Sequence, residues 1–104
     1  MLYKIFLLLS PIYKYKVSGA SMSPTIAAGE YVLVNRLAFL FGSPQIGHIV
    51  ALHDPRDGKI LIKRITKKSG TRYFVQGDNK NSSTDSRVFG MIERNDIIGK
   101  VIIS

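Results

Sequence analysis

Short apolar runs, several of them alternating with polar residues, follow one another along most of the chain. Alternation with period two is typical of strands that have one buried face. The runs with strand character are 13–17, 31–35, 48–52, 59–65, 72–76 and 97–103. Turn-forming sequences separate them, at Ala28-Gly29, Gly47, 54–58, 68–70 and 77–81. This pattern predicts a mainly β, compact, single domain, built as a barrel or a sandwich.

One apolar segment, "RLAFLF" at 36–41, does not follow the strand pattern. It is interpreted either as a short helix or as an exposed apolar loop. A packed segment would belong to the core. An exposed one would form a contact surface for a substrate or a membrane.

The chain of 104 residues is strongly basic. It has 15 Lys and Arg against 7 Asp and Glu, which gives a net charge of +8. Such a balance favours an anionic partner. The basic residues are nevertheless scattered from Lys4 to Lys100, without a zinc-finger, helix-turn-helix or RNA-binding pattern, so no nucleic-acid partner is predicted. The absence of cysteine excludes disulfides, thiolate catalysis and a Cys-ligated zinc site.

The N-terminal segment 1–16 contains the apolar run Ile5–Leu9, followed by Ser10 and Pro11. A bilayer span needs about 20 apolar residues, so this run is too short to cross a membrane. It is expected to pack on the core as a first strand or short helix, with loose contact to an anionic membrane face as the alternative. The expected division is therefore an N-terminal segment 1–16 and a main domain 17–104.

Three serines, Ser18, Ser21 and Ser23, lie close together beside Gly19 and Pro24. Small residues and proline favour a rigid bend. The simplest interpretation is a surface turn, and the alternative is a nucleophile. A serine hydroxyl becomes a good nucleophile only when a nearby base takes its proton.

Histidine is the first candidate for this base. His48 or His53 could form a triad with Asp54 or Asp57, and His48, His53 and Asp54 could also hold a metal ion. The spacing supports neither site, because residues five apart on a regular strand point to opposite faces.

Lysine is the second candidate. Within "KILIKRI", Lys63 shares one face of the predicted strand with Leu61 and Ile65. The other face, at residues 60, 62 and 64, is also largely apolar. Desolvation lowers a lysine pKa, and a neutral lysine is a good general base. The alternative is a lysine whose stem packs while its head reaches water.

A polar segment, "GDNKNSSTDSR" at 77–87, precedes another apolar run. It could be a long hairpin loop. It could also place Ser83 or Ser86 to orient an amine, with Asp85 paired to Arg87.

Taken together, these segments resemble the signal peptidase I family of Ser-Lys proteases, with the motifs in family order from residue 17 to residue 103. "SGASMSPTI" resembles the nucleophile box and would make Ser21 the nucleophile. "GHIV" resembles the Gly-Asp-Ile-Val motif, with His48 in place of the aspartate. "IKRI" resembles the lysine box and would make Lys63 the general base.

The "GDNKNSSTDSRVFG" segment resembles the last box of the family. The resemblance implies that Ser83 orients the lysine, that Asp85 and Arg87 form a supporting ion pair, and that Arg64 pairs with Asp78.

The chain departs from the family pattern in several places. Some members carry a serine at the position of Gly19, and its hydroxyl helps to bind the oxyanion. Here that role is expected to fall to backbone N–H groups, chiefly that of Ser21, with Ser18 as an additional donor. The link between residues 65 and 77 is too short for the large extra β-domain of bacterial signal peptidases.

The resemblance implies a serine endopeptidase that uses no cofactor or metal and removes an N-terminal leader or signal peptide from a precursor protein. The "HDPRDGKILIKRI" passage and the short link to "RYFVQGDN" are similar to the small proteases that mature nickel-type superoxide dismutase. This favours a cytoplasmic protein with at most loose membrane association. The alternatives are a reduced, membrane-associated signal peptidase, a self-cleaving repressor-type peptidase, and a non-catalytic basic binding module.

Overall fold

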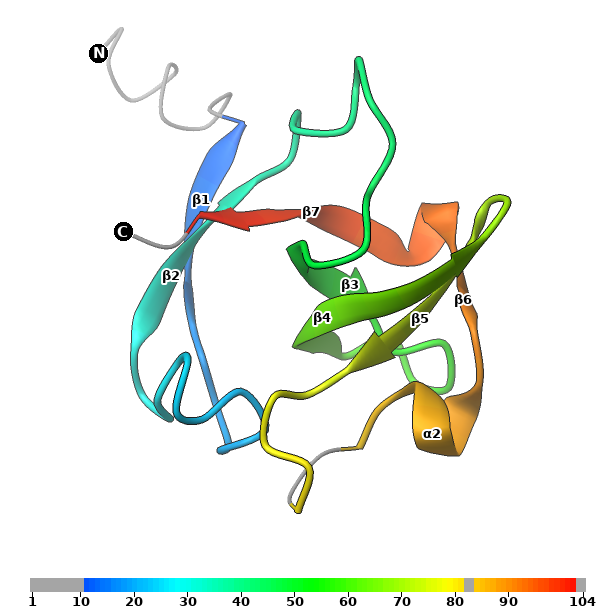
Figure 1. Cartoon of the computed structure of the whole chain (residues 1–104). Coiled ribbons are helices and arrows are strands. Elements are labelled where there is room, and N and C mark those ends of the chain that lie inside the picture. Colours follow the sequence, from blue (N-terminus) through cyan, green and yellow to red (C-terminus); the bar gives the residue numbers. More distant parts are fainter. Residues whose placement is uncertain (1–10, 82–83, 103–104) are drawn as a thin grey trace, which may run out of the picture.

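The computed structural model describes residues 11–81 and 84–102, which form one antiparallel sheet curled into a half-barrel (Figure 1). The strands are β1 (Ile12–Lys16), β2 (Tyr31–Asn35), β3 (Ile49–His53), β4 (Ile60–Ser69), β5 (Arg72–Gln76), β6 (Ile92–Glu93) and β7 (Ile97–Ile102). Their order in the sheet is β1-β2-β7-β3-β4-β5-β6. A short helix α2 (Ser86–Phe89) and a 3₁₀ turn η1 (Arg94–Asp96) complete the fold. The predicted mainly β fold is confirmed.

The central strand β3 is apolar on both faces because the curled sheet has a hydrophobic cluster on each side of it. Ile49 and Ala51 belong to one cluster, together with buried residues of β2 and of the segment between β1 and β2. Val50 and Leu52 belong to the other, with buried residues of β5, β6 and β7. A continuous apolar run is the expected pattern for a strand covered on both faces.

The predicted strands agree with the observed ones to within a few residues. β2 and β5 occupy the predicted ranges, 31–35 and 72–76. β4 extends to Ser69, beyond the predicted end, and its pairing with β5 shifts register between Ile65 and Lys67. Three elements are absent from the sequence prediction: the short helix α2, the two-residue strand β6 and the 3₁₀ turn η1, which are too short to produce a periodic pattern.

The segment 36–41 forms turns and bends, not a helix. Phe39 is buried and its ring stacks on His48, with the ring centroids 5.7 Å apart. Leu37, Leu40 and Phe41 are exposed. Both environments considered for this segment therefore occur within it.

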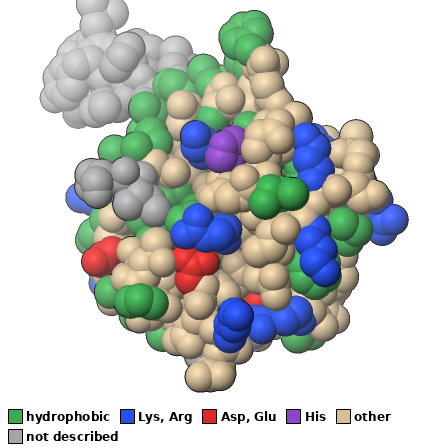
Figure 2. Space-filling model, in the orientation of Figure 1, with side chains coloured by type: hydrophobic (Ala, Val, Ile, Leu, Met, Phe, Trp, Pro, Cys, Tyr) green, Lys and Arg blue, Asp and Glu red, His purple; other side chains and the backbone are tan. Residues whose placement is uncertain are grey.

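Strand β1 pairs with β2 along its whole length, from Ile12 opposite Asn35 to Lys16 opposite Tyr31. The described part of segment 1–16 is thus integral to the sheet, while the division at residue 17 stays a prediction. Among residues 11–81 and 84–102, no helix has the length and apolar character needed to cross a membrane. Lys and Arg side chains are spread over the face seen in Figure 2, without a single concentrated patch.

Gly99 is required where β7 lies against β2. A Cβ atom at this position would lie 2.5 Å from the Asn35 carbonyl oxygen and 3.0 Å from the Arg36 Cα. Because both neighbours are backbone atoms, at the end of β2 and in the turn that follows it, we expect Gly99→Ala to lower the free energy of unfolding by about 1–3 kcal/mol. Urea denaturation followed by circular dichroism measures the change.

Gly42→Ala is the matched control for Gly99→Ala, because no atom lies within 4 Å of a Cβ built there. We expect its midpoint of unfolding to stay at the wild-type value. Equal midpoints for both variants would show that β2 and β7 do not approach as closely as described.

Candidate active site

The serine-rich bend is a closed loop between β1 and β2, here called the Ser21 loop (residues 17–30). Its two ends are joined by hydrogen bonds: the Val17 N–H donates to the Glu30 carbonyl (2.8 Å), and the Gly29 N–H donates to the Val17 carbonyl (2.7 Å). Met22 and Ile26 of this loop are fully buried, and both belong to the same hydrophobic cluster of the core. The loop is thus anchored by its apolar residues, which leaves the serines nearer the surface.

The residues around Ser21 have restricted backbone geometry. Gly19 has a φ of 78°, in the left-handed region that favours glycine. The Ser23-Pro24 peptide bond is cis. Ser21 itself is half-buried and Ser18 is exposed.

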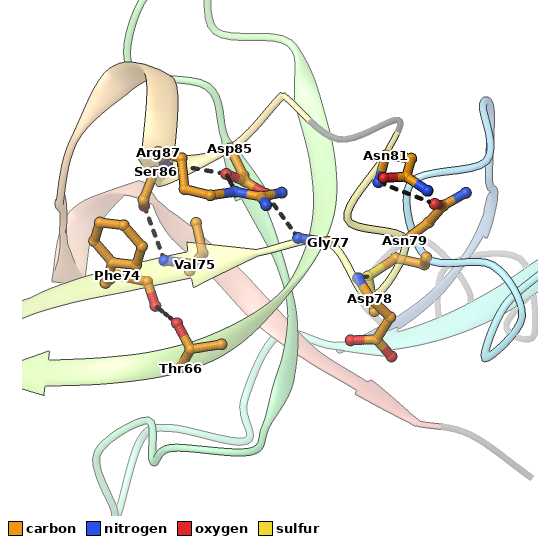
Figure 3. Close-up of polar contacts among 11 residues, drawn as sticks. Thr66, Phe74, Val75, Gly77, Asp78, Asn79, Asn81, Asp85, Ser86 and Arg87 are labelled. Carbon is orange, nitrogen blue, oxygen red and sulfur yellow. Dashed lines mark hydrogen bonds and ion pairs between the residues drawn. The ribbon is translucent and has the colours of Figure 1, made fainter.

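The turn after β5 holds the Ser21 loop from the other side. The Asn79 N–H donates to the Ser21 carbonyl (2.8 Å), and the Asn79 amide Nδ2 donates to the Ala20 carbonyl (3.0 Å). The Thr25 hydroxyl donates to Asp78 (2.6 Å). Figure 3 shows Asp78 and Asn79 side by side on this turn. Both carbonyls next to the Ser21 side chain are therefore fixed by residues some 60 positions later in the chain.

Arg64 links strand β4 to the same turn. Its guanidinium makes two hydrogen bonds to the Asp78 carboxylate, each 2.9 Å long, and a third to the Gly47 carbonyl (2.9 Å). The pairing holds the pKa of Asp78 below its usual value. The Arg64–Asp78 ion pair implied by the family resemblance is present.

Lys63, the neighbour of Arg64 on β4, is buried, with 3% of its surface exposed. This contradicts the alternative in which its head extends into water. Lys63 and Ser21 line one small cavity of about 50 Å³. The other residues around this cavity are Tyr15, Val17, Ser18, Ile60, Leu61 and Ile62.

Burial lowers the pKa of the Lys63 amine below its ordinary value, because the apolar surroundings disfavour the charged form. The Asp85 carboxylate raises this pKa and the Arg87 guanidinium lowers it, so the two groups partly cancel. The net direction is downward, which favours a neutral amine in the cavity.

Asp85 is fully buried and organises the segment before α2 (Figure 3). It accepts hydrogen bonds from the Gly77 N–H (2.9 Å), the Arg87 N–H (3.0 Å) and the Arg87 guanidinium (2.9 and 2.8 Å). The Asp85–Arg87 ion pair implied by the resemblance is thus present. It joins the end of β5 to the start of α2 and holds that segment near Lys63.

The serine candidates in segment 77–87 have different positions. Ser83 lies outside the described residues, so its predicted role stays a prediction. Ser86 is buried, and its hydroxyl accepts a hydrogen bond from the Val75 N–H (2.8 Å), which fixes α2 to β5.

Neither histidine lines the cavity of Ser21 and Lys63. His48 precedes β3 and accepts a hydrogen bond from the Gln45 N–H at Nδ1 (3.1 Å), while His53 contacts the Gly58 carbonyl (3.0 Å). Asp54 is paired with Arg56. Within the described ranges, no three His, Cys, Asp or Glu residues are grouped so as to hold a metal ion.

Two residues of the site were not singled out from the sequence. Tyr15 lines the cavity, and its hydroxyl donates to the Ile60 carbonyl (3.2 Å), which joins β1 to β4. Asn79 fixes the carbonyls of the Ser21 loop. The signal for Asn79 was its place in the "GDN" motif, and that for Tyr15 was the alternation of "YKYKV".

Comparison with known proteins identifies the family of the chain. The family model described as "Signal peptidase, peptidase S26" matches residues 1–72 and 68–104. The mitochondrial ATP-independent inner membrane protease subunit 1a of Arabidopsis thaliana is 32% identical, over 84% of this chain and 66% of the relative. The probable signal peptidase I-1 of Synechocystis sp. is 25% identical, over 83% of this chain and 67% of the relative.

Signal peptidase I U of Bacillus subtilis is 27% identical over 91% of this chain and 76% of the relative. The chain spans about two thirds of the length of the first two relatives. The match of the family model extends over the whole chain. The chain therefore belongs to the signal peptidase family, peptidase S26.

Proposed function

We propose that this protein is a serine endopeptidase that removes an N-terminal leader or signal peptide from a precursor protein, with Ser21 as nucleophile and Lys63 as general base. The observation that carries the proposal is that Ser21 and a buried lysine of lowered pKa line the same cavity. The names of the relatives, which are signal peptidases and an inner membrane protease, support the same reaction class.

In the proposed reaction the neutral Lys63 amine takes the proton from the Ser21 hydroxyl as its oxygen attacks the scissile carbonyl carbon. The resulting ammonium then donates this proton to the leaving amine, and the acyl group stays on Ser21. A water molecule, deprotonated by the same lysine, hydrolyses the acyl-enzyme. We assign the oxyanion contact to the Ser21 N–H, with the Ser18 hydroxyl as a second donor.

The surrounding ion pairs have a positioning role in this proposal. The pair of Arg64 and Asp78 holds the turn that anchors the Ser21 loop. The pair of Asp85 and Arg87 sets the charge near the lysine amine. Ser83 is proposed, from its place in the last sequence box alone, to orient that amine.

The identity of the precursor that is cleaved is a more specific part of the proposal. The "HDPRDGKILIKRI" passage supports a nickel-type superoxide dismutase precursor as the substrate of a cytoplasmic protease with loose membrane contact. The names of the relatives support an exported precursor cleaved at a membrane. Co-expression with each precursor, followed by N-terminal sequencing of the product, distinguishes them. Removal of the secretory leader alone would exclude the superoxide dismutase precursor.

The proposed base predicts how the cleavage rate depends on pH. Only the neutral amine can accept the serine proton, so the rate should rise with pH through the pKa of Lys63, which lies below its ordinary value. Activity should be lost as pH falls through that lowered pKa. Single-turnover cleavage of a precursor peptide across a pH series measures this rise, which is the acid limb of the pH–rate profile.

Arg87→Gln should move this limb to higher pH. The substitution removes a cation that lowers the Lys63 pKa and leaves the Asp85 carboxylate, which raises it, without its charged partner. Arg72→Gln is the matched control, because Arg72 pairs with Glu93 at the surface, away from the cavity. A limb that stays in place in Arg87→Gln, or that follows a group lost in His48→Gln, would contradict Lys63 as the base.

A further inference from the structure

The segment between β2 and β3 places large apolar side chains in water. Phe41 is 100% exposed, Leu40 63% and Leu37 51%. In Figure 1 this segment extends from the sheet at the top of the molecule, and Figure 2 shows hydrophobic side chains projecting there. A fully exposed phenyl ring gains free energy when a partner removes it from water.

A pocket of about 640 Å³ lies at the base of this segment, within the size range of sites for small molecules. Phe39 and Val101 supply apolar surface, and Asn35, His48 and Lys100 supply polar groups. Among the described residues that line it, none is acidic. The pocket shares no lining residue with the cavity of Ser21 and Lys63.

The polar groups of the pocket are held as hydrogen-bond donors. Because the Gln45 N–H donates to His48 Nδ1, the ring proton of the neutral imidazole is on Nε2. Stacking against Phe39 fixes the plane of this ring. Lys100 lies near enough to His48 to act on it electrostatically, and Lys68 donates to the Ser43 hydroxyl at the pocket wall (2.9 Å). The pocket is thus suited to an anion with several oxygen acceptors.

We propose that this pocket binds the headgroup of an anionic phospholipid while Leu37, Leu40 and Phe41 enter the interface of the bilayer. A basic site next to exposed apolar side chains is the combination by which proteins attach to anionic membrane surfaces. The net charge of +8 favours approach to such a surface. A free anion would use the pocket but would leave the apolar projection in water, which is why a lipid fits better.

The absence of tryptophan from the chain gives a direct test. In the full chain, Phe41→Trp introduces a single indole at the tip of the projection. With vesicles of phosphatidylcholine containing phosphatidylglycerol, we expect its emission to shift to the blue, and with phosphatidylcholine alone to stay in place. Val88→Trp is the matched control, at a position 63% exposed on α2, and should not shift. An unshifted indole at position 41, or an equal shift at position 88, would overturn the proposal.

A second measurement tests the pocket. Lys100→Gln should weaken co-sedimentation with the anionic vesicles about fivefold, the effect expected for one basic residue at a membrane surface. Lys59→Gln removes the same charge from an exposed position outside the pocket and should change binding less. Equal losses in the two variants would show attraction by net charge alone and overturn the pocket as the headgroup site.

A third arm distinguishes a lipid from a free anion. Inorganic phosphate is titrated into the full chain and followed by the NMR signals of His48 and Lys100. Saturable binding of phosphate together with an unshifted indole at position 41 would overturn the lipid as occupant. Vesicle binding does not depend on catalysis, so Ser21→Ala should bind like the wild type whether or not the proposed proteolysis is correct.

Discussion

Ser21→Ala should lower the rate of precursor cleavage on the order of 10⁴-fold or more while the fold stays intact. The side chain is half-buried at the cavity, whereas the Ser21 backbone, which Asn79 holds, is unchanged by the substitution. Ser23→Ala is the matched control, because Ser23 lies in the same loop but does not line the cavity. It should cleave at nearly the wild-type rate.

Lys63→Met should have the same effect on the rate, because it removes the proposed base but keeps the length of the side chain. Lys67→Met, at an exposed position of the same strand, is its control and should remain active. The double variant of Ser21 and Lys63 should be no slower than either single variant, since the two groups act as one unit.

One outcome with these variants would contradict the proposed mechanism. Cleavage at the wild-type rate by folded Ser21→Ala or Lys63→Met would exclude the Ser-Lys mechanism. Loss of cleavage in the controls Ser23→Ala or Lys67→Met would show that the assay responds to disturbance of the loop or strand and not to the two reacting groups. Circular dichroism and the unfolding midpoint establish that each variant is folded.

Asp85→Ala should lower the free energy of unfolding by about 3 kcal/mol. The substitution removes a fully buried carboxylate that accepts hydrogen bonds from the Gly77 N–H and from the backbone and guanidinium of Arg87. Arg87 is one-third exposed and can recover some hydration, so we place the loss at the lower end of the range for buried pairs. Thermal and urea unfolding measure it.

The control for Asp85→Ala is Arg72→Ala, which breaks an ion pair at the surface. Arg72 and Glu93 are each 59% exposed, and Arg72→Ala should cost less than about 1 kcal/mol because water screens the pair. Similar losses for Asp85→Ala and Arg72→Ala would contradict the burial of Asp85. A rise of the cleavage rate with pH that moves to lower pH in folded Asp85→Ala would further indicate that this carboxylate raises the pKa of Lys63.

Most strands of the fold could be predicted from the sequence because strand patterning is local. The predicted ranges 31–35 and 72–76 match β2 and β5, and both faces of β4 pack on apolar clusters, as the two apolar faces of "KILIKRI" indicated. The bulge after Ile65 and the helix α2 could not be predicted. They depend on bonds between distant segments, such as the one from the Val75 N–H to Ser86.

The candidate site could be predicted only in part. The sequence motifs selected Ser21, Lys63 and the two ion pairs, but not the role of Asn79 or Tyr15. These two residues contribute through contacts across the fold: Asn79 reaches the Ser21 loop from the turn after β5, and Tyr15 reaches β4 from β1. Periodicity within a segment contains no information about which distant segment it will meet.

The sequence by itself determined the β class, the choice of Ser21 and Lys63 as the candidate nucleophile and base, and the apolar character of the strand that carries the lysine. The tertiary structure decided that Lys63 is buried, that it shares a cavity with Ser21, and that segment 36–41 buries Phe39 while exposing Phe41. The reason is physical: alternation and turn chemistry act between neighbours in the chain, whereas desolvation, and with it the lowered pKa of Lys63, depends on every segment that packs around the amine.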